Sequence, residues 1–214
     1  MTLSGGSIIA IKYKGGVMMT ADTLLSFGRM ARYRGFSRIR SFGDNTLISF
    51  TGDHADFTTL MEEMEKEIEH DVQQDDGVVL NASEIHTLLT RILYHHRSDM
   101  KPKWTYLIVA GSDKDGKSFL GYIDLYGTHF ECDYTATGYA EDLALPMIRR
   151  EWNPEITEDQ AAALLQKCVK VCVARDCKQS SDIQFAKVSE TGTSLSRPVK
   201  IDCDWSVASY KEIE

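Results

Sequence analysis

Histidine and cysteine side chains are the first candidates for chemistry in this sequence, as metal ligands or as nucleophiles. Cys168 and Cys172 lie four residues apart in a segment with helical periodicity, so they share one helix face. Two thiols alone do not complete a metal site, and core packing is the better interpretation of this pair. His95 and His96 are adjacent, and a helix points adjacent side chains apart, which makes chelation poor. We therefore predict no metal site and no cofactor.

Cys177, next to Asp176, is another possible nucleophile. No histidine lies near it in the sequence, so a base would have to come from a distant segment. The pair Gly15-Gly16 lacks the Gly-Lys-Ser/Thr of a phosphate loop and is typical of a tight turn. The acidic run from Glu62 to Glu69 fits a solvated helix face better than a metal site. None of these motifs defines an activity by itself.

Composition limits the classes of partner. The 214 residues carry 32 acidic and 24 basic side chains, and this net charge of −8 does not favour a nucleic-acid groove. We expect no membrane span, because no apolar run approaches about 18 residues, and no signal peptide, because the N-terminus has no basic region. Five cysteines without a CxxC motif are typical of reduced thiols in the cytoplasm or nucleus. The 4 prolines and the lack of a linker-like stretch favour a single domain over residues 1–214.

The predicted strands and helices that would position a site alternate in groups along the sequence. Short runs rich in β-branched and aromatic residues predict strands at 7–13, 17–21, 39–42, 47–51, 104–110, 119–125 and 183–188. Helical spacing and capping signals predict helices that follow Gly52, open at Asn81, cover 140–152 and open at Thr157. Helices come in pairs between strands, which argues against a parallel βαβ sheet. The order fits an α+β fold, a four-layer αββα sandwich with two sheets between helical layers.

Five local motifs follow one another along the chain: Gly15 to Asp22 with Gly28, Ser37-Arg38-Ile39, Phe50 to Asp56, Ala136 to Ala140, and Arg175-Asp176. Their order and spacing resemble those of proteasome β-type subunits over roughly residues 6–190. The resemblance is strongest to a non-catalytic member, and it implies the N-terminal nucleophile hydrolase fold.

Active members of this family expose a threonine as residue one, whose hydroxyl attacks the peptide carbonyl while its own α-amine accepts the proton. The resemblance places that threonine sixteen residues before Asp22, which is Gly6 (22 − 16 = 6). It places the family's lysine sixteen residues after Asp22, which is Arg38 (22 + 16 = 38). Glycine has no hydroxyl, and arginine does not release its proton.

Three further site positions fall at Thr137, Asp176 and Gln179, where the family carries serine, aspartate and serine. Only the aspartate is retained. We therefore expect a degenerate site without catalytic residues, in which Asp22 and Arg38 form a buried ion pair.

Nearby hydroxyl side chains leave an alternative open: an active threonine-type endopeptidase that works through Thr2 or Ser7. Ser7 is one residue from position 6, and a strand points its side chain to the opposite face. Ser4 lies two residues away, roughly 7 Å along a strand, and Thr2 lies farther upstream. A free-standing binding domain of the same fold is a third interpretation. The first residue of the mature chain and the native size would distinguish the three.

The resemblance implies a non-catalytic structural subunit of the 20S core, needed for ring assembly and half-particle pairing in ubiquitin-dependent protein degradation. Its partners would be other α- and β-type subunits in a 28-subunit stacked-ring particle, in the cytoplasm and nucleus, with no nucleic acid and no membrane. We expect the tail, residues 199–214, to reach a neighbouring subunit through Trp205, Val207 and Tyr210, because Trp and Tyr are frequent interface anchors.

Overall fold

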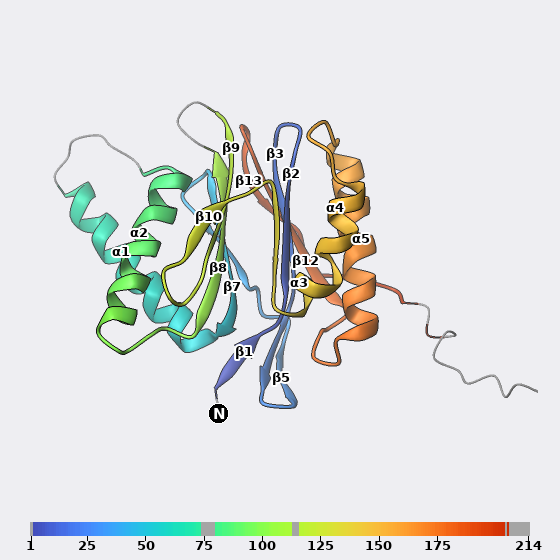
Figure 1. Cartoon of the computed structure of the whole chain (residues 1–214), viewed down its shortest axis with the longest axis horizontal. Coiled ribbons are helices and arrows are strands. Elements are labelled where there is room, and N and C mark those ends of the chain that lie inside the picture. Colours follow the sequence, from blue (N-terminus) through green and yellow to red (C-terminus); the bar gives the residue numbers. More distant parts are fainter. Residues whose placement is uncertain (1, 74–79, 113–115, 204, 206–214) are drawn as a thin grey trace, which may run out of the picture.

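The computed structural model describes residues 2–73, 80–112, 116–203 and 205. Two antiparallel sheets lie face to face at its centre (Figure 1). The first sheet has the order β10 (His129–Glu131), β9 (Ser118–Ile123), β8 (Thr105–Ser112), β7 (Thr46–Asp53), β1 (Leu3–Gly5), β4 (Leu24–Phe27) and β5 (Met30–Arg34), and β6 (Ile39–Phe42) also pairs with β7. The second has the order β11 (Tyr134–Thr137), β2 (Ile8–Tyr13), β3 (Gly16–Asp22), β12 (Asp182–Ser189) and β13 (Gly192–Leu195), and β14 (Val199–Lys200) also pairs with β12.

Helices cover the outer face of each sheet (Figure 1). The helices over the first sheet are α1 (His54–Val72) and α2 (Ala82–Ser98). Those over the second are α3 (Tyr139–Leu143), α4 (Leu145–Glu151) and α5 (Glu158–Arg175). The four-layer αββα sandwich predicted from the sequence is confirmed.

Three apolar clusters hold the layers together. Between the sheets, Ile8 and Ala10 of β2 meet Leu47 of β7 and other residues of the first sheet. The alternate residues of β2, Ile9 and Ile11, face the layer of α3, α4 and α5 instead. Because both faces of each sheet are covered, the central strands are buried along nearly their whole length. The third cluster packs α1 and α2 on the first sheet.

Both predicted capping boxes open their helices. Asn81 and Glu84 cap α2, and Thr157 and Gln160 cap α5. The predicted helix over 140–152 is in fact two helices, α3 and α4, that meet at Ala144. A proline lies in the first turn of α4, and because proline has no N–H it fits the start of a helix better than its interior.

The residues first considered for metal binding have structural roles. Cys168 and Cys172 are fully buried on the inner face of α5, as predicted. Burial raises the pKa of Cys168 to about 12 and that of Cys172 to about 11, so both thiols keep their protons. His96 Nε2 lies 2.6 Å from Glu63 Oε2 and ties α2 to α1. Among the described residues, no three His, Cys, Asp or Glu side chains form a group that could hold a metal ion.

Two further findings bear on the sequence predictions. No helix in the described part of the chain has the length and apolar character to cross a membrane. The segment from 199 onward, predicted as a tail, begins within the fold, because Val199 and Lys200 pair with β12 and Ile201 is buried against α5. Its predicted anchors Val207 and Tyr210 lie outside the described residues.

Candidate active site

Arg38 lies at the centre of the predicted site, with only 1% of its surface exposed. A guanidinium has five N–H donors, and the five hydrogen bonds of Arg38 match that number. Four acceptors are backbone carbonyls and the fifth is a carboxylate: Asp22 O (2.9 Å from Nε), Gly6 O (2.7 Å) and Phe50 O (3.2 Å) from Nη1, and Ser7 O (2.7 Å) and Asp22 Oδ1 (2.5 Å) from Nη2. The side chain thereby ties the start of β2 to the end of β3 and to β7.

Asp22, the last residue of β3, is the partner of this guanidinium. Its Oδ1 accepts from Arg38, and its Oδ2 accepts from the backbone N–H of Ser180 at 2.9 Å. Burial raises the pKa of Asp22, while the charge of Arg38 and the N–H of Ser180 oppose that shift. The buried ion pair expected from the sequence is confirmed, and both oxygens of the carboxylate are already bound.

Gly6 lies beside this carboxylate. A Cβ at position 6 would be 3.8 Å from Asp22 Oδ1, so a side chain there would point at the charged pair. The positions that the family resemblance assigned to the nucleophile, the aspartate and the lysine are therefore adjacent in space. No hydroxyl is present at position 6, and the carbonyl of Gly6 accepts from both Arg38 Nη1 and Thr51 Oγ1.

The chain before Gly6 forms β1, which is inserted between two strands of the first sheet. Leu3, Ser4 and Gly5 pair with β4 on one side, and the last two of them pair with β7 on the other. The nitrogen of Gly6 is thus an internal amide in this structure. An amide nitrogen cannot act as the general base that the free α-amine of an N-terminal threonine provides.

The other predicted site residues divide into two groups. Thr137 is joined to Gly6 by a short chain of hydrogen bonds, because its Oγ1 lies 2.6 Å from Thr51 Oγ1, which donates to Gly6 O at 2.8 Å. Asp176 instead accepts from the N–H of Lys178 within its own loop at 2.9 Å. The negative charge of Asp176 is one of the causes that raise the pKa of Asp22. Gln179 Oε1 is buried without a hydrogen-bond partner among the described residues.

Sequence reasoning missed several residues that complete the site. Thr51 connects Thr137 to Gly6, Ser180 binds Asp22, and Gly5 leaves the space that Arg38 occupies. A Cβ on Gly5 would lie 2.7 Å from Arg38 Cδ. Only the Phe-Thr-Gly-Asp motif pointed to Thr51, and it did not indicate which way the hydroxyl faces.

The alternative nucleophiles are placed elsewhere. Ser7 is 3% exposed, and its hydroxyl accepts from the N–H of Ala140 at the start of α3 at 3.1 Å. Its side chain therefore points to the helical layer and away from the carboxylate of Asp22, as the alternation of a strand predicted. Thr2 is exposed ahead of β1, and Ser4 lies within β1.

Two antiparallel sheets between helical layers are the architecture of the N-terminal nucleophile hydrolases, and here a buried charged pair lies beside the start of β2. A family model described as "Proteasome subunit" matches residues 2–188 of this chain. The chain therefore belongs to the proteasome subunit family, and it resembles the β-type members. Membership implies assembly with other proteasome subunits in the core particle, which is a protease complex.

Named relatives narrow the resemblance. The chain is 36% identical over 208 residues to proteasome subunit beta type-4 of Arabidopsis thaliana, covering 97% of this chain and 84% of that protein. It is 39% identical over 202 residues to the beta type-4 subunit of Dictyostelium discoideum, covering 94% and 78%. A probable beta type-7 subunit of Schizosaccharomyces pombe is 32% identical over 211 residues, covering 96% and 80%. These names agree with the resemblance to β-type proteasome subunits that the sequence motifs indicated.

Replacing Arg38 tests its structural role. We expect Arg38→Met to lower the free energy of unfolding by about 3–5 kcal/mol, because Asp22 would remain buried without its cation. Arg38→Lys should cost about 1–3 kcal/mol, because an ammonium has three donors for five acceptors. Urea denaturation measures both, and the exposed Arg91→Lys on α2 is the control, expected within about 0.5 kcal/mol of wild type. An Arg38→Lys protein as stable as wild type would contradict the account.

The neighbouring glycines provide a matched pair of variants. Gly5→Ala should destabilise the fold by about 1–3 kcal/mol, because the new methyl group overlaps a guanidinium side chain that cannot move without breaking its hydrogen bonds. Gly6→Ala adds the same methyl group where the nearest atom is 3.8 Å away and the backbone φ is not positive, so it should be neutral within about 1 kcal/mol. Equal effects of the two substitutions in urea denaturation would show that Arg38 does not restrict this segment.

Proposed function

We propose that this chain is a non-catalytic structural β subunit of the 20S proteasome core. The observation that carries the proposal is the arrangement around Gly6. A threonine protease needs a hydroxyl, a free amine and a group that can exchange protons, and position 6 supplies neither of the first two. The cation beside it is an arginine, which keeps its proton and whose donors are all engaged.

The retained charged pair has a structural explanation that requires no catalysis. Arg38 and Asp22 hold together strands from both sheets, and removing either would leave the other buried and unpaired. Selection for a stable subunit is enough to account for a cation at position 38. This supports a site that kept its framework while it lost its nucleophile.

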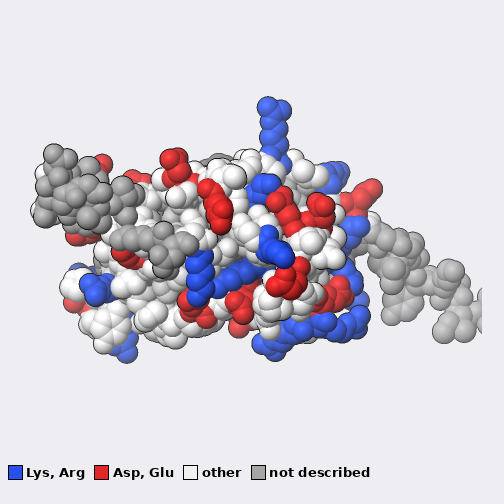
Figure 2. Space-filling model, turned by 90° about the horizontal axis from the view of Figure 1, so that it is seen from above, with Lys and Arg blue, Asp and Glu red and all other residues white. Residues whose placement is uncertain are grey.

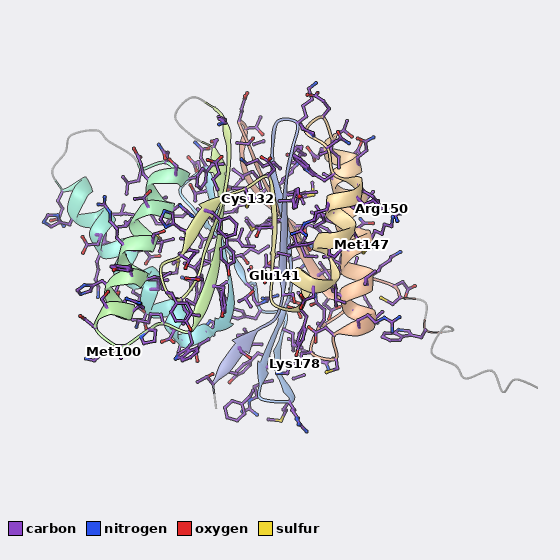
Figure 3. All side chains as sticks on the ribbon, in the orientation of Figure 1. Met100, Cys132, Glu141, Met147, Arg150 and Lys178 are labelled. Carbon is purple, nitrogen blue, oxygen red and sulfur yellow. The ribbon has the colours of Figure 1, made fainter. Side chains whose placement is uncertain are left out.

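In this proposal the chain contributes surfaces to the particle. It takes its place with α- and β-type subunits in the 28-subunit particle, in the cytoplasm and nucleus, and acts in ring assembly. Several large side chains that are more than half exposed fit such a role, because a partner would cover them; they include Tyr94, Met100, Trp104, Tyr126 and Tyr139. Met100 lies at the end of α2, at the edge of the molecule in Figure 3.

The C-terminal segment is the second part of the proposal. Trp205 is 58% exposed just beyond β14, where it is available to an adjacent chain. The pairing of β14 with β12 and the burial of Ile201 hold the residues that precede this segment on the fold. We infer that residues 204–214 reach a neighbouring subunit and stabilise the pairing of half-particles.

Restoring the hydroxyl alone should not restore activity. In assembled particles, we expect Gly6→Thr to remain unlabelled by a β-lactone or epoxyketone probe, because Arg38 stays in place of the lysine and β1 still precedes position 6. Catalytic sister subunits in the same particle provide the positive control, and Gly6→Ala provides the negative one. A labelled Gly6→Thr chain, identified by mass spectrometry, would contradict the prediction.

Truncation tests the assembly role. A chain that ends after Cys203 keeps β14 and Ile201 but lacks Trp205 and the residues that follow. We expect it to enter half-particles normally and to form fewer full particles, as measured by native gel electrophoresis. Trp205→Ala in the full-length chain should show part of the same defect. Full particles at wild-type abundance with the truncated chain would remove this part of the proposal.

A further inference from the structure

A cavity of about 320 Å³ lies between the β4–β5 hairpin and the loop that follows α5. Lys178, from that loop, is at the end of the molecule where the hairpin projects (Figure 3). Three separate elements contribute cations to this cavity. Lys178 comes from the loop after α5, Arg34 from β5 and Lys200 from β14. Leu24 and Asp182 line it beside these three cations.

Backbone pairing fixes these side chains relative to one another. Arg34 is opposite Leu24 in the β4–β5 pair, and Lys200 is opposite Asp182 in the β12–β14 pair. Thr23, next to Leu24, donates both its N–H and its hydroxyl to the carbonyl of Asp182, at 3.0 and 3.1 Å. The hairpin and the β12–β14 pair are therefore joined directly beside the cavity.

The charge of the cavity differs in sign from that of the chain. Three cations and one carboxylate line it, which gives +3 − 1 = +2, whereas the whole chain carries −8. None of Arg34, Lys178 and Lys200 forms an ion pair with a carboxylate of the described residues, Asp182 included. On the opposite end of the molecule, acidic and basic side chains are interspersed (Figure 2). The cavity is thus a concentration of unpaired positive charge.

An exposed apolar rim adjoins these cations. Phe27, Met30 and Tyr33 of the hairpin are 38%, 53% and 48% exposed, and the guanidinium of Arg32 lies 5.7 Å from the ring centre of Tyr33. β5 is also the edge of its sheet, with all five residues exposed. Stable proteins usually cover or protect the edge strands of their sheets. A small free anion would leave the rim uncovered, whereas a protein surface would cover the rim and fill the cavity.

We infer that this cavity receives carboxylate side chains, Asp or Glu, from an adjacent proteasome subunit. The inference rests on the proposed role in assembly and adds the chemistry of one contact. Arg34 can bind a carboxylate through two parallel N–H donors, and the two lysines can bind a second or share the first. The apolar rim packs on the partner around this polar contact.

Zero-length cross-linking of assembled particles tests the contact directly. A carbodiimide joins a lysine amine to a carboxylate that it already touches, so we expect amide bonds from Lys178 or Lys200 to Asp or Glu of another subunit. Two pairs within this chain provide the positive control, Lys12–Glu131 at 2.9 Å and Lys187–Glu158 at 2.6 Å. Control products with no product from Lys178 or Lys200 to another subunit would overturn the inference.

Charge variants give an independent measurement. When wild-type and variant chains compete for incorporation, we expect Arg34→Glu/Lys178→Glu to enter particles at least about tenfold less often than wild type. Arg34→Lys/Lys178→Arg keeps the charge at the same positions and should compete nearly equally. Both side chains are exposed, so neither change should disturb the fold.

The outcomes separate this inference from the proposed function. If wild-type chains fail to enter particles, the proposed function fails and the inference with it. If wild-type chains enter and the charge-reversed chains enter equally well, the cavity has no such role and the proposed function stands. Reduced entry of the reversed chains without any cross-link from Lys178 or Lys200 to another subunit would mean that the cavity does not contact a partner's carboxylate, and it would overturn the inference.

Discussion

The five hydrogen bonds of one buried guanidinium determine much of this structure. Arg38 binds carbonyls of Gly6, Ser7, Phe50 and Asp22 as well as the Asp22 carboxylate, so it connects the start of β2, the end of β3 and the middle of β7. A buried cation is costly unless every donor is satisfied, which makes this arrangement hard to change one residue at a time. It also explains the glycine at position 5, which leaves room for the arginine side chain. The same group that stabilises the sandwich occupies the position to which the family resemblance assigns a lysine.

The proposed loss of catalysis follows from this arrangement. A lysine has three rotatable N–H donors and can give up a proton, so its hydrogen bonds can change during a reaction. An arginine keeps its proton, and here all its donors are engaged, so it acts as a fixed structural link. The chain ahead of Gly6 completes the first sheet as β1, so a free amine at position 6 would come at the expense of two strand pairings. The proposed functions of the chain lie on its surfaces instead: the exposed aromatic residues, the C-terminal residues that follow β14, and the basic cavity beside the β4–β5 hairpin. All three would be covered only in an assembled particle.

Much of the fold could be predicted from the sequence, because its signals are local. Apolar runs marked β2, β3, β7 and β8, and capping boxes marked the starts of α2 and α5. The strands β4 and β5 were missed because both are short and neither alternates apolar with polar residues, and because their position in the sheet depends on β1. The site positions at Gly6, Asp22 and Arg38 could be predicted because the resemblance to the family supplied the spacing between them. The roles of Thr51, Ser180 and Gly5 could not, because they depend on hydrogen bonds and close contacts between segments distant in sequence.

The central claim is that the peptide chain remains continuous through Gly6, with β1 in the sheet and Arg38 bound to the carbonyls that follow. The intact mass of this subunit, measured after purification of the assembled particle, tests that claim most directly. The account predicts a mass that includes Leu3, Ser4 and Gly5, whatever happens to the residues before them. A mature chain that begins at Gly6 or Ser7 would contradict it, because β1 would then be lost and a free amine would lie beside Asp22.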